Sequence, residues 1–215
     1  MQKALKQDSG FKKTTEKGKD GPTARLERRE KTPVSENRPL AIRVAAIAAV
    51  FVLVVMGPLK LKGLKNEARD VFRNGTNSRF AISVYNDIHT AADNAVTFAG
   101  LAESVLTQND ADAKKLRALS ETIRDTEDEA KLLSAFAELK VVTEDLYTRF
   151  ENAKPDENAA KQAYSCYKNI KSAYETVSKD GYFTLAHNFN EARGGFPANL
   201  MALIGGIGSL PEGVK

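Results

Sequence analysis

The longest hydrophobic stretch of the chain covers residues 40–59, with the sequence LAIRVAAIAAVFVLVVMGPL and a single charge at Arg43. As a helix rising about 1.5 Å per residue, it would be roughly 30 Å long, which matches the hydrocarbon thickness of a bilayer. Arg43 lies close to one end, where its side chain can reach the lipid headgroups. The pattern therefore predicts one transmembrane helix over residues 40–59.

Two other interpretations of this stretch stay open. A buried core helix is one of them, because the run without any charge covers only residues 44–59, but a core helix has no need to be apolar on every face. A cleaved signal peptide is the other, but the charged region before the apolar run would be unusually long. We therefore expect an uncleaved, single-pass membrane anchor.

A heptad pattern follows in the next part of the chain. Its apolar positions alternate in steps of four and three, which predicts a long helix that packs in a left-handed bundle or coiled coil. Asn77 or Ser78, in the turn before it, is the expected N-cap. The positions of the heptad stripe are Val84, Ile88, Ala91, Ala95, Phe98, Ala102 and Val105.

Helical spacing continues to about residue 192, interrupted by signals for new helix starts. The segment NDADA, residues 109–113, is a helix cap, and the acidic cluster DTEDE, residues 125–129, suggests that a helix restarts there. Pro155 is expected at the first position of the last helix. Asp180 and Gly181 form a typical turn pair, but helical spacing resumes beyond them, so we expect that helix to continue.

These patterns predict an all-α protein in which a single N-terminal transmembrane helix precedes an antiparallel three- to four-helix bundle. The lone Cys166 cannot form an internal disulfide. The expected organisation is a disordered basic arm (1–39), the transmembrane helix (40–59), a stalk (60–77), the bundle (78–195) and an apolar, glycine-rich C-terminal flap (196–215) that covers the end of the bundle. Contact of this flap with the bilayer is the alternative.

The formal net charge of +4 is unevenly distributed. Residues 1–39 carry 11 Lys and Arg against 6 Asp and Glu, whereas residues 60–215 carry 20 against 22. A folded part without excess positive charge disfavours nucleic-acid binding. Because translocation of so basic an arm is unfavourable, we expect the arm in the cytoplasm and the bundle outside the cell membrane.

Candidate chemistry is sparse. His89 with Asp93, and His187 with Glu191, are pairs four residues apart that could each supply two metal ligands, but the Glu-x-x-His motif of di-iron bundles is absent. We expect these histidines to be surface or capping residues. The remaining candidates are Cys166, expected to be an inert, partly buried thiol, and the stripe Tyr164, Tyr167 and Tyr174, expected at the edge of the core.

No phosphate-binding glycine loop, nucleophile elbow or cysteine pair is present, so the sequence suggests no catalytic residue, no cofactor, no evident substrate and no enzyme activity.

One stretch, GYFTLAHNFNEARGGFPANLMA, resembles the signature of the bacterial LemA family. Such proteins show two aromatic-Asn pairs seven residues apart and then Phe-Pro-x-Asn, after a transmembrane helix and an antiparallel bundle. Here Phe183 replaces the first Asn, and Gly194 and Gly195 precede the Phe-Pro pair. The resemblance implies a structural role for Tyr182, Phe189, Asn190, Phe196, Pro197 and Asn199, and it carries no catalytic residue.

LemA proteins are often described with the bundle in the cytoplasm, whereas the basic arm of this chain predicts the opposite. The expected function is a membrane-anchored helical scaffold or interaction module of the bacterial envelope, which binds a protein partner or associates with itself. A metal- or small-ligand-binding bundle is the alternative.

Overall fold

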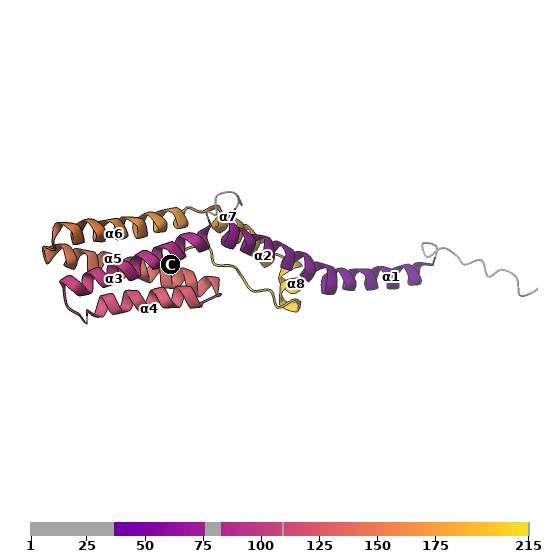
Figure 1. Ribbon diagram of the computed structural model, residues 1–215. Helices are drawn as coiled ribbons and strands as arrows, with labels where there is room; N and C mark the ends of the chain where they lie inside the picture. Colours follow the sequence, from indigo (N-terminus) through magenta and orange to yellow (C-terminus); the bar gives the residue numbers. More distant parts are fainter. Residues whose placement is uncertain (1–36, 76–82, 109, 215) are drawn as a thin grey trace, which may run out of the picture. The chain divides into compact units, whose positions relative to one another are not determined.

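The computed structural model describes residues 37–75, 83–108 and 110–214. The predicted arm lies almost entirely outside these residues, and so do the expected caps Asn77 and Ser78. Residues up to Ala46 and residues from Ile47 onward form two compact units, and the packing reported below belongs to the second. Every regular element in the described ranges is a helix, which confirms the all-α class (Figure 1).

The predicted membrane segment begins a helix that runs without a break from Arg38 to Asn74. It consists of α1 (Arg38–Phe51), a short π-helical turn η2 (Val52–Met56) and α2 (Gly57–Asn74). The π turn lies just before Pro58, and the backbone N–H of Gly57 donates to the carbonyl of Val52. Because a proline ring clashes with the carbonyl four residues earlier, a wider turn at this point lets the helix continue.

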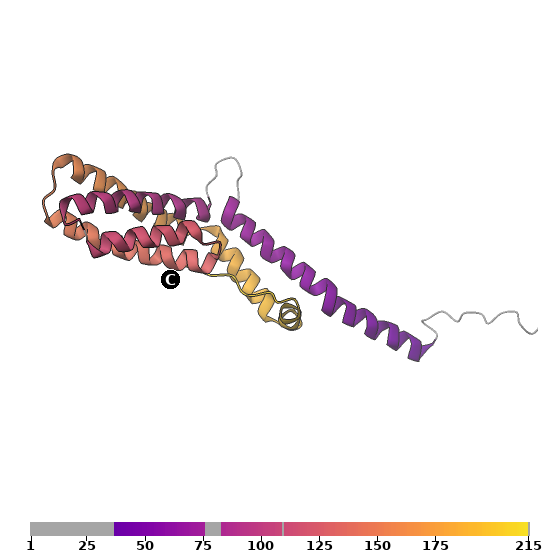
Figure 2. The ribbon, with the colours of Figure 1, turned by 60° about the horizontal axis from the view of Figure 1, so that its bottom comes forward.

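Four further helices form a packed bundle: α3 (Val84–Val105), α4 (Ala111–Asp125), α5 (Glu129–Asn152) and α6 (Glu157–Ser178). Each helix packs against the next, and α6 closes the bundle against α3 (Figure 2). The heptad prediction is confirmed, because the first six positions of the stripe are at most 1% exposed and Val105 packs against the same core. Alanine at three of the positions lets the neighbouring backbones approach closely.

Carboxylate caps set where the bundle helices begin. Asp110 accepts hydrogen bonds from the backbone N–H groups of Asp112 and Ala113, so the predicted cap before α4 is confirmed. Asp128 caps α5 in the same way, as the acidic cluster predicted. Asp110 also receives two hydrogen bonds from Arg149, at 2.8 and 2.9 Å, which joins the start of α4 to the end of α5.

The last part of the chain differs from two predictions. Pro155 does not occupy the first helical position, because Asp156 caps α6 and the helix starts at Glu157. The continuous helix expected through Gly181 is also wrong: α6 ends at Ser178, and Asp180 caps a separate helix, α7 (Gly181–Gly194). The turn preference of the Asp-Gly pair therefore outweighs the helical spacing on either side of it.

The C-terminal segment forms one more short helix, α8 (Ala198–Ile204), after Gly194 and Gly195 end α7 as expected. Helix α8 packs against η2, α2 and α7, and the tail beyond it places Ile207 and Leu210 in the core. The described part of the segment expected to be a stalk, residues 60–75, is likewise packed, because α2 contacts α3, α7 and α8. The C-terminal segment therefore packs against the long helix Arg38–Asn74, a contact that the sequence pattern did not predict.

Candidate functional site

The inner face of α2 is apolar despite the many charges of this helix. Leu61, Ala68 and Phe72 are at most 6% exposed, and Phe72 packs edge-on against Tyr182 of α7 with ring centroids 4.9 Å apart. These contacts make the second half of the helix Arg38–Asn74 part of the hydrophobic core. Side-chain packing, in addition to the covalent backbone, therefore joins the folded domain to the helix that contains the apolar stretch.

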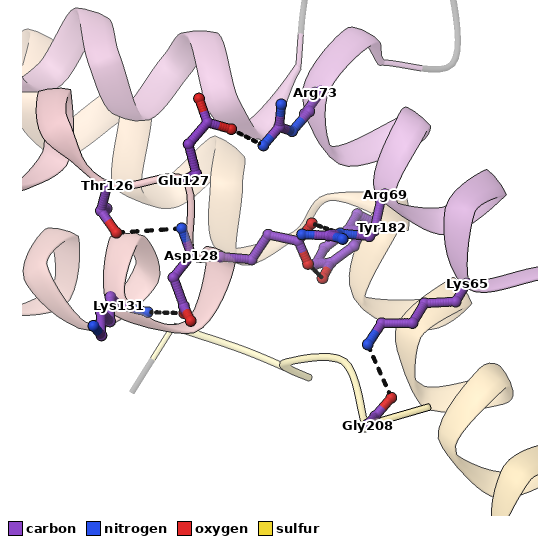
Figure 3. A network of polar contacts seen from close by, with 10 residues as sticks. Lys65, Arg69, Arg73, Thr126, Glu127, Asp128, Lys131, Tyr182 and Gly208 are labelled. Atoms are coloured by element: carbon purple, nitrogen blue, oxygen red, sulfur yellow. Dashed lines mark hydrogen bonds and ion pairs between the residues drawn. The ribbon is translucent and has the colours of Figure 1, made fainter. Parts of the chain in front are cut away.

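A buried carboxylate of α5 binds both Arg69 of α2 and Tyr182 of α7, which lie beside each other in Figure 3. Glu129, at the start of α5, is only 7% exposed. One of its oxygens accepts a 2.6 Å hydrogen bond from Nε of Arg69, and the other accepts a longer one, 3.5 Å, from the Tyr182 hydroxyl. We call Arg69, Glu129 and Tyr182 the α2–α5 junction.

A second ion pair lies beside this junction. Arg73, one turn further along α2, pairs with Glu127 in the turn before α5. The acidic cluster thus caps α5 through Asp128 and also binds the basic face of α2, whereas the sequence indicated the cap alone. The signal that could have found it is the spacing of Lys65, Arg69 and Arg73, which lie four residues apart on one side of a helix.

The local electrostatics favour the charged state of the guanidinium. The hydrogen bond and the negative charge of Glu129 raise the pKa of Arg69 above its usual value. Burial, followed by the nearby Glu129 charge, raises the pKa of Tyr182, so its hydroxyl keeps its proton. Burial and the adjacent Arg69 lower the pKa of Lys65.

Side chains of α7 and α2 hold the C-terminal tail through hydrogen bonds to its backbone. The amide of Asn190 bonds to both backbone groups of Leu210, donating at 2.8 Å and accepting at 2.9 Å. Arg193 donates to the carbonyl of Ile207 at 2.8 Å, and Lys65 donates to that of Gly208 at 3.1 Å. The tail therefore lies against the domain along its length.

The six residues of the LemA-like motif divide into two groups. Tyr182, Phe189 and Asn190 lie on α7, where the two aromatic rings are buried and Asn190 holds the tail. The other three, Phe196, Pro197 and Asn199, are exposed around the start of α8, and the Asn199 side chain accepts a hydrogen bond from the backbone of Leu200. The motif residues therefore do not converge on a common pocket.

The first candidate metal pair does not form a ligand set. The His89 ring packs at a tilt against Tyr85 with ring centroids 4.1 Å apart, and burial lowers the pKa of His89. Its Nε2 is buried and makes no hydrogen bond within the described residues, so this side chain is less exposed than the sequence suggested. Asp93 instead forms a 2.6 Å ion pair with Arg124 of α4.

The second pair lies at the surface. His187 is 3.5 Å from Glu191 and 3.3 Å from Glu212, and more than half of its side chain is exposed. In the part of the chain that the structure describes, no three His, Cys, Asp or Glu residues are arranged to hold a metal ion.

The remaining candidates are packed or plainly exposed. Cys166 is 7% exposed and burial raises its pKa, which disfavours the reactive thiolate. Tyr174 packs against Phe136, and Tyr167 stacks on Tyr147 at 4.2 Å, so both lie at the edge of the core as expected. Tyr164 differs, because 54% of it is exposed.

An open groove lies between the start of α5 and the C-terminal tail. It is lined by Ala130, Leu133 and Ser134 of α5, Asn190 of α7 and residues 209–213 of the tail. Its lining is mostly apolar, and it holds no pair of groups suited to acid-base or nucleophilic chemistry.

The helix Arg38–Asn74 is long and apolar enough to cross a membrane, and its most apolar stretch has no buried residue. No family model, no curated protein and no solved structure matches the chain.

Removing the Glu129 carboxylate tests the junction. The Glu129→Ala substitution should lower the free energy of unfolding by about 2 kcal/mol and the Tm by roughly 4–8 °C, because Arg69 and Tyr182 lose their partner at a buried position. Circular dichroism of the full chain in detergent micelles measures this change.

The matched control is Glu127→Ala, which removes a carboxylate from the exposed pair with Arg73. Its side chain is 77% exposed, so the loss should stay below about 0.5 kcal/mol. Equal losses in the two variants would contradict a special role of Glu129.

Proposed function

We propose that this protein is a membrane-anchored helical scaffold or interaction module of the bacterial envelope, with no catalytic activity of its own. The observation that carries this proposal is the helix Arg38–Asn74. Its first half presents apolar side chains outward on every side, and its second half contributes Leu61, Ala68 and Phe72 to the core of the folded domain. An exposed apolar helix of this length is stable only where lipid or protein covers it.

The proposed topology is a single pass with the basic N-terminal arm in the cytoplasm and the antiparallel bundle outside. The concentration of Lys and Arg before residue 40, together with Arg43, supports this orientation. The basic residues that immediately flank the span are balanced, five on each side within about 16 residues, so the rest of the arm decides the direction.

The arrangement of the domain supports a scaffold more than a ligand-binding role. Asp110 and Asp128 serve as helix caps, and the pairs Arg69–Glu129 and Arg117–Glu103 join neighbouring helices, so these charges hold the bundle together. Membership of the LemA family, as a divergent member, is a further proposal of ours. It rests on the order of a membrane helix and a bundle and on the motif from Tyr182 to Asn199.

Labelling of introduced cysteines tests the topology. Ser172→Cys places a thiol on the exposed surface of α6, and Ser9→Cys places one in the N-terminal arm. A membrane-impermeant maleimide applied to intact spheroplasts should label the first variant, and it should label the second only after lysis. The unmodified chain is the control, because its buried Cys166 should react slowly in either preparation.

The two possible contradictions have different meanings. Labelling of Ser9→Cys alone in intact spheroplasts would reverse the orientation but keep the span. Labelling of both variants on the same side would exclude a single-pass protein.

Crosslinking in intact cells tests the interaction role. A short amine-reactive crosslinker should join the full chain to a second copy or to another protein, giving discrete bands above the 23.5 kDa of one chain on denaturing gels. The positive control is a known envelope complex that the same reagent crosslinks in the same cells. If that complex is crosslinked and this chain is recovered only as a single chain, the interaction role is contradicted.

A further inference from the structure

The outer face of α8 is apolar and uncovered. Phe196, which precedes the helix, is 86% exposed, and Leu203 on the helix is 79% exposed. Leu200 and Ile204 are 40% and 46% exposed. No charged residue occurs between Arg193 and Glu212. A surface this apolar on so short a segment indicates contact with something other than water.

The opposite face of α8 is firmly packed on the anchor helix. Ala202 is 2% exposed, and Met201 fills the space beside Gly57 so closely that a side chain at Gly57 would collide with its thioether. A Cβ on Gly205 would lie 2.9 Å from the ring of Pro58. The position of α8 on the Gly57–Pro58 step therefore depends on small residues on both sides.

This contact lies at the end of the apolar run. Helix α8 touches η2 and the beginning of α2 (Figure 1). The first lysines of α2, Lys60 and Lys62, follow in the chain and are exposed. Lysines that follow an apolar span lie at the level of the lipid headgroups. Helix α8 is thus at the depth where the proposed span leaves the hydrocarbon.

Polar contacts restrict which way α8 can face. Lys65 and Arg193 bind the backbone carbonyls of Gly208 and Ile207, on the side of the domain. The exposed apolar side chains lie at residues 196–204, which precede these two attachment points in the chain.

We propose that α8 is a second membrane contact, with Phe196, Leu200, Leu203 and Ile204 inserted among the acyl chains of the leaflet where the anchor helix ends. This inference rests on the proposed membrane span. Lipid is favoured over a protein partner because Met56 and Leu59, which flank the Gly57–Pro58 step in the chain, belong to the proposed span and are 53% and 63% exposed. An apolar helix lying in the interface is a known mode of membrane attachment.

Depth-dependent fluorescence quenching tests the inference in the full chain. In a Cys166→Ser background, an environment-sensitive fluorophore is attached at Leu203→Cys and, separately, at Phe196→Cys. The chain is reconstituted into phosphatidylcholine and phosphatidylglycerol vesicles that contain lipid with a nitroxide either near the headgroup or near the middle of the acyl chain. Controls carry the fluorophore at Ile47→Cys in the span and at Val141→Cys, which is 54% exposed on α5.

Both α8 positions should be quenched more by the shallow nitroxide than by the deep one, and at least about threefold more than position 141. Position 47 should be quenched best by the deep nitroxide. Quenching at position 47 but not at 196 and 203 would overturn this inference and leave the anchor intact. Absence of quenching at position 47 would overturn the proposed span as well.

Protection of positions 196 and 203 from both lipid nitroxides and aqueous iodide would also overturn the inference. That result would mean that a second copy or another protein covers α8.

Discussion

The other contacts depend on the helix Arg38–Asn74, which runs without a break although its two halves have different surroundings. Its first half is apolar and uncovered, whereas Leu61, Ala68 and Phe72 of its second half belong to the core. An interruption between the halves would separate the folded domain from the apolar helix. The π turn before Pro58 is the local adjustment that lets the helix pass a residue which usually ends one.

Helix α2 contributes few apolar side chains, so charge completes its attachment. Its guanidiniums meet the carboxylates at the start of α5, and the least exposed of these, Glu129, is satisfied by Arg69 and the Tyr182 hydroxyl together. A buried carboxylate that contacts two other helices favours one arrangement, because any shift would leave it without a partner. The junction therefore orients the domain on α2, while the apolar contacts supply most of the stability.

The bundle could be predicted from the sequence because periodicity decides which side chains of α3 face their neighbours, and because Asp110 and Asp128 have the chemistry of helix caps. The packing of α2 could not be predicted from the sequence. Its few apolar positions alternate with many lysines and arginines, and Glu129, the partner of Arg69, lies 60 residues further along the chain. The break before Gly181 was missed because local turn chemistry outweighed periodicity. The binding of Asn190 to Leu210 involves backbone groups, which no residue pattern identifies.

Hydrogen exchange of α2 tests the central claim most directly. In the full chain held in lipid nanodiscs, the backbone amides of residues 61–74 should exchange as slowly as those of α5, because both helices are packed in the same core. Mass spectrometry of overlapping peptides measures the two rates in one sample. Exchange of residues 61–74 at the rate of an unstructured peptide, with α5 still protected, would show that a flexible stalk joins the apolar half of the helix to the bundle and would contradict the account.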